Sequence, residues 1–370
     1  MFNFKQVPEF RDLVTFIPNK HEPIHDWYYY KEGYAKQLVD ILIDRFKISS
    51  QHIVLDPFTG VGTTLLACKQ RGIQSIGFDV SPLCTFVSRV KTSDYEISEL
   101  SEAVIAALKW KFRKPLQIPQ DKWLKRVFSS YALEDIVFYR NNIMQLENEK
   151  LRNFLMLGLL DSAMHCSYAY KDGAFVKIMK RPVAPVGKIF KYKIRRMLKE
   201  LRENQPPAVE ARIESGDARD LKLEDGSVDF VITSPPYLNK IEYTQIYRTE
   251  YALFFDLPET RLRSFIGESL EETLQGFESF PPAAQAYFKD MKKVSQELYR
   301  VCKPGAKLAV VIGGGCFPDQ SINVDELFAK LSENIGFKIN DILVARNSWC
   351  TRAKTIKIGQ IRESIVIMER

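Results

Sequence analysis

Apolar positions near the start of the chain alternate between short continuous runs and a helical period. Residues 52–56 (HIVLD) predict a buried strand, and residues 62–71 predict a helix that ends at Gly72. Residues 75–79 (SIGFD) predict the next strand. A strand, a tight turn, a helix and a strand in so short a stretch form a βαβ unit. This unit predicts a parallel sheet with right-handed crossovers.

The alternation then gives way to helical patterning from about Tyr95 to Pro207. Residues 154–164 are apolar nearly all round, which predicts a buried helix. The stretch is long enough to form a subdomain, and Pro206-Pro207 would mark its exit. We expect a helical insertion between the second and third strands.

The α/β rhythm resumes after the insertion. Residues 257–282 are polar and turn-rich, which predicts a long loop or a small second insertion. Five further strands are predicted, at residues 211–215, 228–233, 307–312, 337–345 and 364–368. The expected fold is therefore an α/β domain with seven strands. Its two parts are residues 1–94 and 208–370, interrupted by the helical insertion 95–207.

Composition is that of an ordinary soluble globular protein. Of the 370 residues, 45% are hydrophobic and 27% are charged. No apolar run has the length of a signal peptide or a transmembrane helix. The six cysteines are scattered without zinc or redox spacing, and the four histidines lack metal spacing. We expect reduced, mostly buried thiols, a cytoplasmic location and no metal.

Positive charge is concentrated in one stretch. The net charge is +7, and residues 171–202 contain eleven Lys or Arg against Asp172 and Glu200. Such a block is typical of a polyanion-binding surface, and the aromatic residues interleaved with it favour nucleic acid. The alternative is a solvated helix face. The predicted nucleic-acid contacts are Lys188, Lys191, Lys193, Arg195 and Arg196.

The turn after the first predicted strand, DPFTGVG at residues 56–62, has the glycines of a ligand-binding βα turn. Leu65 stands where a dinucleotide site would have its third glycine, and no P-loop lysine is present. Asp56 would repel a phosphate but suits a cationic ligand such as S-adenosylmethionine (SAM). Asp79 ends the next strand, where an acid commonly binds the ribose hydroxyls. Asp217 follows the third strand and could accept from adenine. Helix capping or a loop turn is the alternative for each acid alone.

A second motif, TSPPY at residues 233–237, follows a strongly apolar strand. The two prolines lack N–H groups and hold an extended backbone that presents carbonyl oxygens. Ser234 Oγ and the Pro235 carbonyl could accept the two N–H groups of an exocyclic base amine, which would orient its lone pair. Tyr237 could stack on a base withdrawn from the helix. A plain proline-rich turn is the alternative.

The two motifs together resemble those of the DNA amino-methyltransferases, DPF-x-G-x-GT and [DNS]-PP-[YFW]. The form that begins with serine is typical of N4-cytosine enzymes. Residues 25–43 and the LYRVCKPGAKLAVVI stretch resemble further segments of the family. The resemblance implies a seven-stranded, Rossmann-like SAM-dependent methyltransferase fold, with target recognition assigned to the insertion. The implied catalytic residues are Ser234, Pro235, Pro236 and Tyr237. The implied cofactor-binding residues are Asp56, Pro57, Phe58, Gly60, Gly62, Thr63, Thr64, Asp79, Ser81, Asp217, Ala218 and Tyr30.

The expected activity is therefore SAM-dependent methylation of cytosine N4 in duplex DNA with a flipped base, and a cognate restriction endonuclease is a candidate partner. Three alternatives stay open: an N6-adenine enzyme, an RNA guanine-N2 enzyme and a non-catalytic SAM- or DNA-binding protein. A cytosine-C5 enzyme is disfavoured because no cysteine follows a proline to act as its nucleophile.

Overall fold

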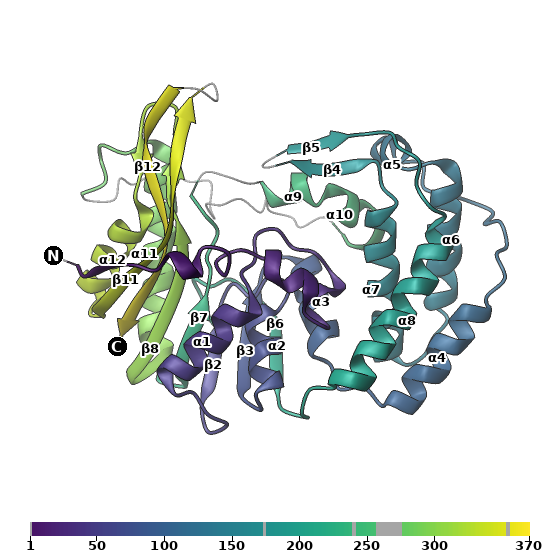
Figure 1. Cartoon of the computed structure of the whole chain (residues 1–370), viewed down its shortest axis with the longest axis horizontal. Coiled ribbons are helices and arrows are strands. Elements are labelled where there is room, and N and C mark those ends of the chain that lie inside the picture. Colours follow the sequence, from purple (N-terminus) through teal and green to yellow (C-terminus); the bar gives the residue numbers. More distant parts are fainter. Residues whose placement is uncertain (1, 173–174, 239–241, 257–275, 353–355) are drawn as a thin grey trace.

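A computed structural model describes residues 2–172, 175–238, 242–256, 276–352 and 356–370. The predicted loop or insertion at residues 257–282 falls largely outside the described residues. Within them, an eight-stranded sheet lies beside a block of helices (Figure 1).

The sheet has the strand order β1-β11-β12-β8-β7-β2-β3-β6. Neighbouring strands are parallel except that β12 runs antiparallel to both β8 and β11, so the sheet is mixed and not purely parallel as the βαβ unit predicted. All seven predicted strands are present. The short edge strand β1 was missed, because its three residues are all exposed and carry no apolar alternation. The bounds are β1 (Phe4–Gln6), β2 (Ile53–Asp56), β3 (Gln74–Asp79), β6 (Ala211–Ser215), β7 (Val228–Thr233), β8 (Cys302–Gly313), β11 (Lys338–Arg352) and β12 (Ile356–Glu369).

Helices cover both faces of the sheet, as the doubly apolar strands require. Val54 and Leu55 are consecutive residues of β2 and belong to different core clusters, because successive side chains point to opposite faces. On one face lie α1 (Lys36–Phe46) and α2 (Thr63–Gln70), and on the other lie α11 (Pro282–Val301) and α12 (Val324–Ile335). The 3-10 turns η1 (Pro8–Phe10), η2 (Ile17–His21) and η3 (His25–Trp27) precede α1.

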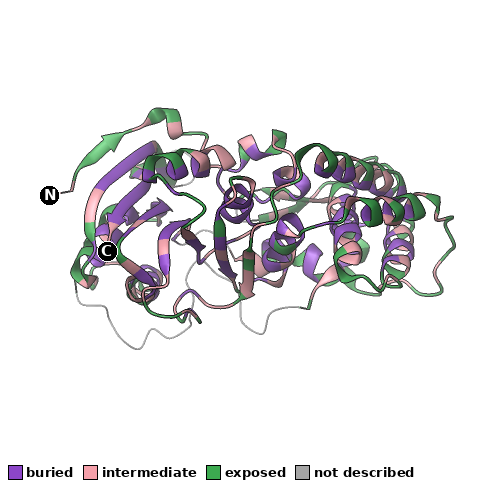
Figure 2. Ribbon diagram, turned by 90° about the horizontal axis from the view of Figure 1, so that it is seen from below, coloured by how far each residue is buried: buried purple, intermediate pink, exposed green. Residues whose placement is uncertain are grey.

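Between β3 and β6 the chain forms α3 and then the helical block, whose interior is buried and whose outer faces are exposed (Figure 2). The helix predicted from residues 154–164 is α7, and its apolar side chains are buried. The prediction of helical structure is wrong at residues 169–172 and 175–178, which form the two antiparallel strands of the β4–β5 hairpin, because these strands are too short to show a clear period. The elements are α3 (Pro82–Thr92), α4 (Ile97–Lys109), α5 (Lys122–Val127), α6 (Ser130–Ile143), α7 (Glu149–His165), β4 (Ala169–Asp172), β5 (Phe175–Ile178) and α8 (Val186–Asn204); α9 (Tyr243–Ile246) and α10 (Arg248–Phe254) follow β7.

The cysteines depart from the expectation of reduced thiols. Cys316 and Cys350 form a disulfide, which joins β9 (Gly315–Cys316) of the small β9–β10 (Ser321–Ile322) hairpin to β11. The other four cysteines are free and buried. Sequence spacing could not reveal this pair, since its members are 34 residues apart and meet only through the sheet.

In the described part of the chain, no helix is both long and apolar enough to cross a membrane. The same residues contain no group of three or more His, Cys, Asp or Glu side chains that could hold a metal ion.

Candidate active site at the carboxyl ends of the strands

The glycine turn between β2 and α2 adopts a backbone that only glycine accepts without strain. Gly60 has φ +51° and Gly62 has φ +80°. A Cβ at Gly62 would lie 2.4 Å from Ser88 Oγ, so α3 packs directly on the turn. A Cβ at Gly60 would lie 3.5 Å from the ring of Tyr30. The turn is thus fixed between α3 and an aromatic side chain of the N-terminal segment.

Asp56 ends β2 and is buried, and its carboxylate is held from several directions. Oδ1 accepts a hydrogen bond from Thr233 Oγ1 at 2.6 Å and from the Phe58 amide at 3.2 Å. Oδ2 accepts from the Tyr34 hydroxyl at 3.1 Å, and that hydroxyl also contacts Thr64 Oγ1. Burial raises the pKa of Asp56 to about 6, although these hydrogen bonds oppose the shift. Since Thr233 directly precedes Ser234, the structure brings the two sequence motifs together.

Asp79 ends β3 beside the same turn. Its carboxylate accepts from the amides of Gly60 and Ser81, each at 2.9 Å. Burial, with a smaller contribution from the charge of Asp56, raises the pKa of Asp79 to about 7, although the amide hydrogen bonds oppose the shift. Among the described residues, no Lys or Arg forms an ion pair with either acid. Two neighbouring acids without a basic partner suit a ligand that carries positive charge and hydroxyl groups.

Two stacked tyrosines lie beside the glycine turn. The rings of Tyr30 and Tyr247 stack with their centroids 5.3 Å apart, and Tyr30 faces Gly60. The Lys171 ammonium lies 3.6 Å from the Tyr247 ring centroid and pairs with the buried Glu250 at 2.5 Å. Sequence reasoning identified Tyr30 but missed Tyr34 and Tyr247. Tyr34 lies in the quoted 25–43 segment, whereas no motif marked Tyr247.

The remaining predicted cofactor residues lie around these acids, and some of their polar groups already have partners within the protein. Asp217 follows β6, and both of its oxygens accept from Arg219. Burial acts to raise its pKa, but the hydrogen bonds and charge of Arg219 outweigh it and hold the pKa below the ordinary value. Ser81 Oγ caps α3 and contacts the Tyr251 hydroxyl at 2.8 Å. Thr63 and Ala218 are buried, and Phe58 packs against the sheet core.

The diproline segment, residues 234–237, follows β7 and belongs to no helix or strand, with Pro235 buried and Ser234 partly exposed. The Tyr237 hydroxyl donates a hydrogen bond to Glu363 Oε1 at 2.6 Å, and Arg346 pairs with the other oxygen of that carboxylate. The ring lies against Gly313, where a Cβ would come within 2.6 Å of it. Tyr237 is therefore fixed at one ring face and at its hydroxyl. Glu363 was missed because its position in an ordinary strand carries no motif.

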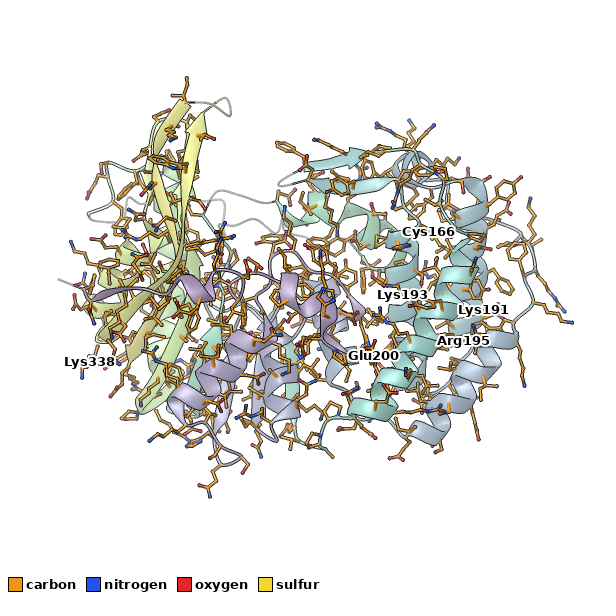
Figure 3. The ribbon with its side chains drawn as sticks, viewed as in Figure 1. Cys166, Lys191, Lys193, Arg195, Glu200 and Lys338 are labelled. Carbon is orange, nitrogen blue, oxygen red and sulfur yellow. A yellow bond between two sulfur atoms is a disulfide. The ribbon has the colours of Figure 1, made fainter. Side chains whose placement is uncertain are left out.

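The five predicted nucleic-acid contacts all lie on α8, inside the helical block and not beside the strand ends (Figure 3). Lys193 pairs with Asp161, Arg196 pairs with Asp26 at 2.6 Å, and Lys191 donates to the Trp110 carbonyl at 3.3 Å. Lys188 and Arg195 are exposed. The five residues thus do not form one exposed basic surface.

Comparison with known proteins adds to this geometry. The profile of the DNA methylase family N6_N4_Mtase matches residues 15–84, which hold the glycine turn, Asp56 and Asp79. Residues 15–84 are therefore similar to a segment of N6/N4-type DNA methylases. Enzymes of this family use SAM, which confirms the cofactor expected from the sequence.

Curated relatives match over most of the chain. Type II methyltransferase M.BsoBI of Geobacillus stearothermophilus is 27% identical, over 97% of this chain and 88% of its own. Type II methyltransferase M.AvaI of Nostoc sp. is also 27% identical, over 90% of this chain and 83% of its own. A solved SAM-dependent methyltransferase from Methanosarcina mazei covers 89% of this chain and 96% of its own, with 12% identity and a TM-score of 0.34.

Proposed function

We propose that the protein transfers the methyl group of SAM to the exocyclic N4 amine of cytosine in DNA, as the modification enzyme of a type II restriction-modification system. The observation that carries the proposal is the hydrogen bond between Thr233 and Asp56. It joins the acidic glycine turn to the diproline segment, so a cofactor and a base could be bound side by side. The relatives of this chain are type II methyltransferases, which favours DNA as the substrate.

The residues at the strand ends fit SAM, whose bound form would supply a methyl group on a positively charged sulfur. Asp79 would accept hydrogen bonds from the two ribose hydroxyls. Asp217 would accept one from the adenine amino group, through oxygen lone pairs that are not used in its hydrogen bonds with Arg219. Asp56 is surrounded by Thr233, Tyr34 and Phe58, so it acts by its negative charge and by holding the turn. This role differs from the direct ammonium contact suggested by the sequence.

On the base side, Ser234 Oγ and the Pro235 carbonyl would each accept an N–H of the target amine. The lone pair of that nitrogen is delocalised into the ring, and two acceptors favour the tetrahedral geometry that frees it. Bound SAM would supply the methyl group to this nitrogen, and one amine proton would leave to water. Tyr237 would cover the flipped base with the ring face that Gly313 does not occupy.

Cytosine is proposed because the motif begins with Ser234; adenine N6 is the alternative target. Target recognition is proposed for the segment 95–207, and the basic residues of α8 stay a prediction within it. Of the five, Lys188 and Arg195 are exposed and form no ion pair within the described part of the chain.

The test is nucleoside mass spectrometry of unmethylated DNA incubated with the full chain and SAM. We expect N4-methylcytosine, and we expect Tyr237→Ala to abolish it while SAM binding persists. Detection of N6-methyladenine in place of N4-methylcytosine would show that adenine is the target base. Methylation of tRNA in place of DNA would overturn the proposed substrate, and SAM binding without any methyl transfer would overturn the enzymatic proposal.

A further inference from the structure

Two β-hairpins extend on the side of the sheet where the parallel strands end. Strand β8 ends at Gly313, which pairs with Glu363 of β12, yet β11 and β12 stay paired as far as Arg352 and Ile356. The hairpin therefore continues past the carboxyl edge by about 20 Å at the usual rise per strand residue. The β4–β5 hairpin projects on the same side, across from it (Figure 1).

One residue of each hairpin contacts one half of the candidate site. In β12, Glu363 holds the Tyr237 hydroxyl of the diproline segment. In β4, Lys171 lies over Tyr247, which stacks on Tyr30 beside the glycine turn. The two hairpins thus flank the position at which the proposed base and cofactor would meet.

The β4–β5 hairpin exposes apolar and basic side chains that the chain itself does not cover. Val176 and Ile178 face inward against the helical core. Tyr170 is 58% exposed, and its cross-strand partner Lys177 is also exposed and pairs with Asp172 on the same outward face. Phe175 is 74% exposed on the same outward face. Exposed aromatic side chains gathered on one face of a hairpin indicate a surface that binds a partner.

The β11–β12 hairpin repeats the same combination. Trp349 is 52% exposed, and the Lys357 ammonium lies 4.4 Å from its ring centroid. The disulfide from Cys350 to Cys316 braces this hairpin against β9. Aromatic rings beside lysines suit nucleic acid, because the ring contacts sugar or base while the ammonium meets a phosphate.

We propose that the β4–β5 and β11–β12 hairpins, rather than α8, make the main contacts with duplex DNA, one on each side of the candidate site. The inference rests on the proposed function and deepens it. Tyr170 and Lys177 act on one side, and Trp349 and Lys357 on the other. Three of the five predicted contacts on α8 are engaged within the chain, whereas Lys188 and Arg195 are exposed on that helix.

The test compares paired variants of the full chain by fluorescence anisotropy on a labelled, mixed-sequence duplex at several salt concentrations. The variants are Tyr170→Ala with Lys177→Ala, and Trp349→Ala with Lys357→Ala. The matched control on α8 is Tyr192→Ala with Lys188→Ala, which also removes one exposed aromatic and one exposed lysine. Circular dichroism and SAM binding verify that each variant is folded.

We expect each hairpin pair to weaken DNA binding by about five-fold or more and to lower the salt slope by about one. The α8 pair should change both quantities little. If the α8 pair weakens binding while the hairpin pairs do not, the inference fails. The proposed function still stands in that case, provided that the wild type methylates DNA. A wild type that has no affinity for the duplex overturns both.

Discussion

The Thr233 hydroxyl lies 2.6 Å from Asp56 Oδ1 and donates a hydrogen bond to it, although the two residues are 177 positions apart. They end the adjacent parallel strands β7 and β2, so the bond fixes the diproline segment relative to the glycine turn. Because both groups are buried, the geometry between the two motifs depends on this contact.

Replacing Thr233 by Val keeps the shape of the side chain but removes the donor. We expect a loss of about 1–3 kcal/mol in the free energy of unfolding, since Asp56 loses its shortest hydrogen bond. We also expect a lower kcat for methyl transfer. Thr233→Ser is the matched control because it keeps the hydroxyl. Urea denaturation and tritiated methyl transfer measure the two effects; equal behaviour of the Val and Ser variants would show that the bond is unimportant.

Glu363 is predicted to position Tyr237. Removing its carboxylate in Glu363→Ala frees the Tyr237 ring to rotate, whereas Glu363→Gln keeps an acceptor. We expect the Ala variant to lower kcat/KM for DNA about ten-fold, the equivalent of one hydrogen bond to a charged group, and the Gln variant to lower it less.

A purely structural role for Glu363 would affect stability alone. Tyr237→Phe separates the cases, because it keeps the ring and loses only the hydroxyl. If positioning matters, Tyr237→Phe should lie between the wild type and Tyr237→Ala in steady-state kinetics. Loss of stability in Glu363→Ala with unchanged kcat/KM would rule out the positioning role.

Binding of SAM should weaken as the pH falls through 7. Burial raises the pKa of Asp79 to about 7, so below that value the carboxylate takes up a proton and accepts hydrogen bonds less well. The limit is a ten-fold loss of affinity per pH unit. Asp56, whose pKa is raised to about 6, adds to the loss only at lower pH.

Calorimetric titration between pH 8 and pH 6 measures this loss, and Asp79→Asn should bind weakly at every pH without the dependence. Folding stability has the opposite sign. Since the pKa of folded Asp79 exceeds its ordinary value of 3.8, this group reduces stability as the pH rises from about 4 to 7. A parallel decline of affinity in the wild type and in Asp79→Asn would assign the effect to another group.

Sequence reasoning located those parts of the site that depend on local chemistry. The strand ends at Asp56, Asp79 and Thr233 follow from apolar runs bounded by turn residues, and the structure places all three at adjacent strand ends. Glu363 and Tyr247 could not be found this way, because each matters only through a partner distant in the chain.

The same limit applies to charge. The basic stretch 171–202 was interpreted from its own composition, but Lys193 and Arg196 meet Asp161 and Asp26 only once the helices pack. Local composition gives the sign of a segment's charge, but it does not show which charged groups will pair with that segment. The short hairpin β4–β5 was not predicted for a related reason, since its four-residue strands lie between long helices.

Gly62 and Gly72 allow backbone strain and steric clash to be measured separately. Both have positive φ, +80° and +70°, but a Cβ at Gly72 meets nothing within 4 Å, whereas one at Gly62 lies 2.4 Å from Ser88 Oγ. We expect Gly72→Ala to cost about 1 kcal/mol in the free energy of unfolding, and Gly62→Ala to cost at least about 2 kcal/mol and to weaken SAM binding. Equal losses would show that α3 yields to the added methyl group.

The disulfide predicts a thiol count. When the protein is denatured without reductant, four cysteines should react with a thiol reagent, and all six should react after reduction. Reduction should also lower the free energy of unfolding, by about 3–4 kcal/mol for a closed loop of this length in the chain-entropy account. Cys316→Ser should reproduce the loss and should be insensitive to reductant. The control replaces one of the free, buried cysteines. Cys302→Ser suits this purpose better than Cys68→Ser, because Cys68 lies near Asp56 and the turn. Six reactive thiols in the unreduced, denatured chain would show that Cys316 and Cys350 are close but unbonded.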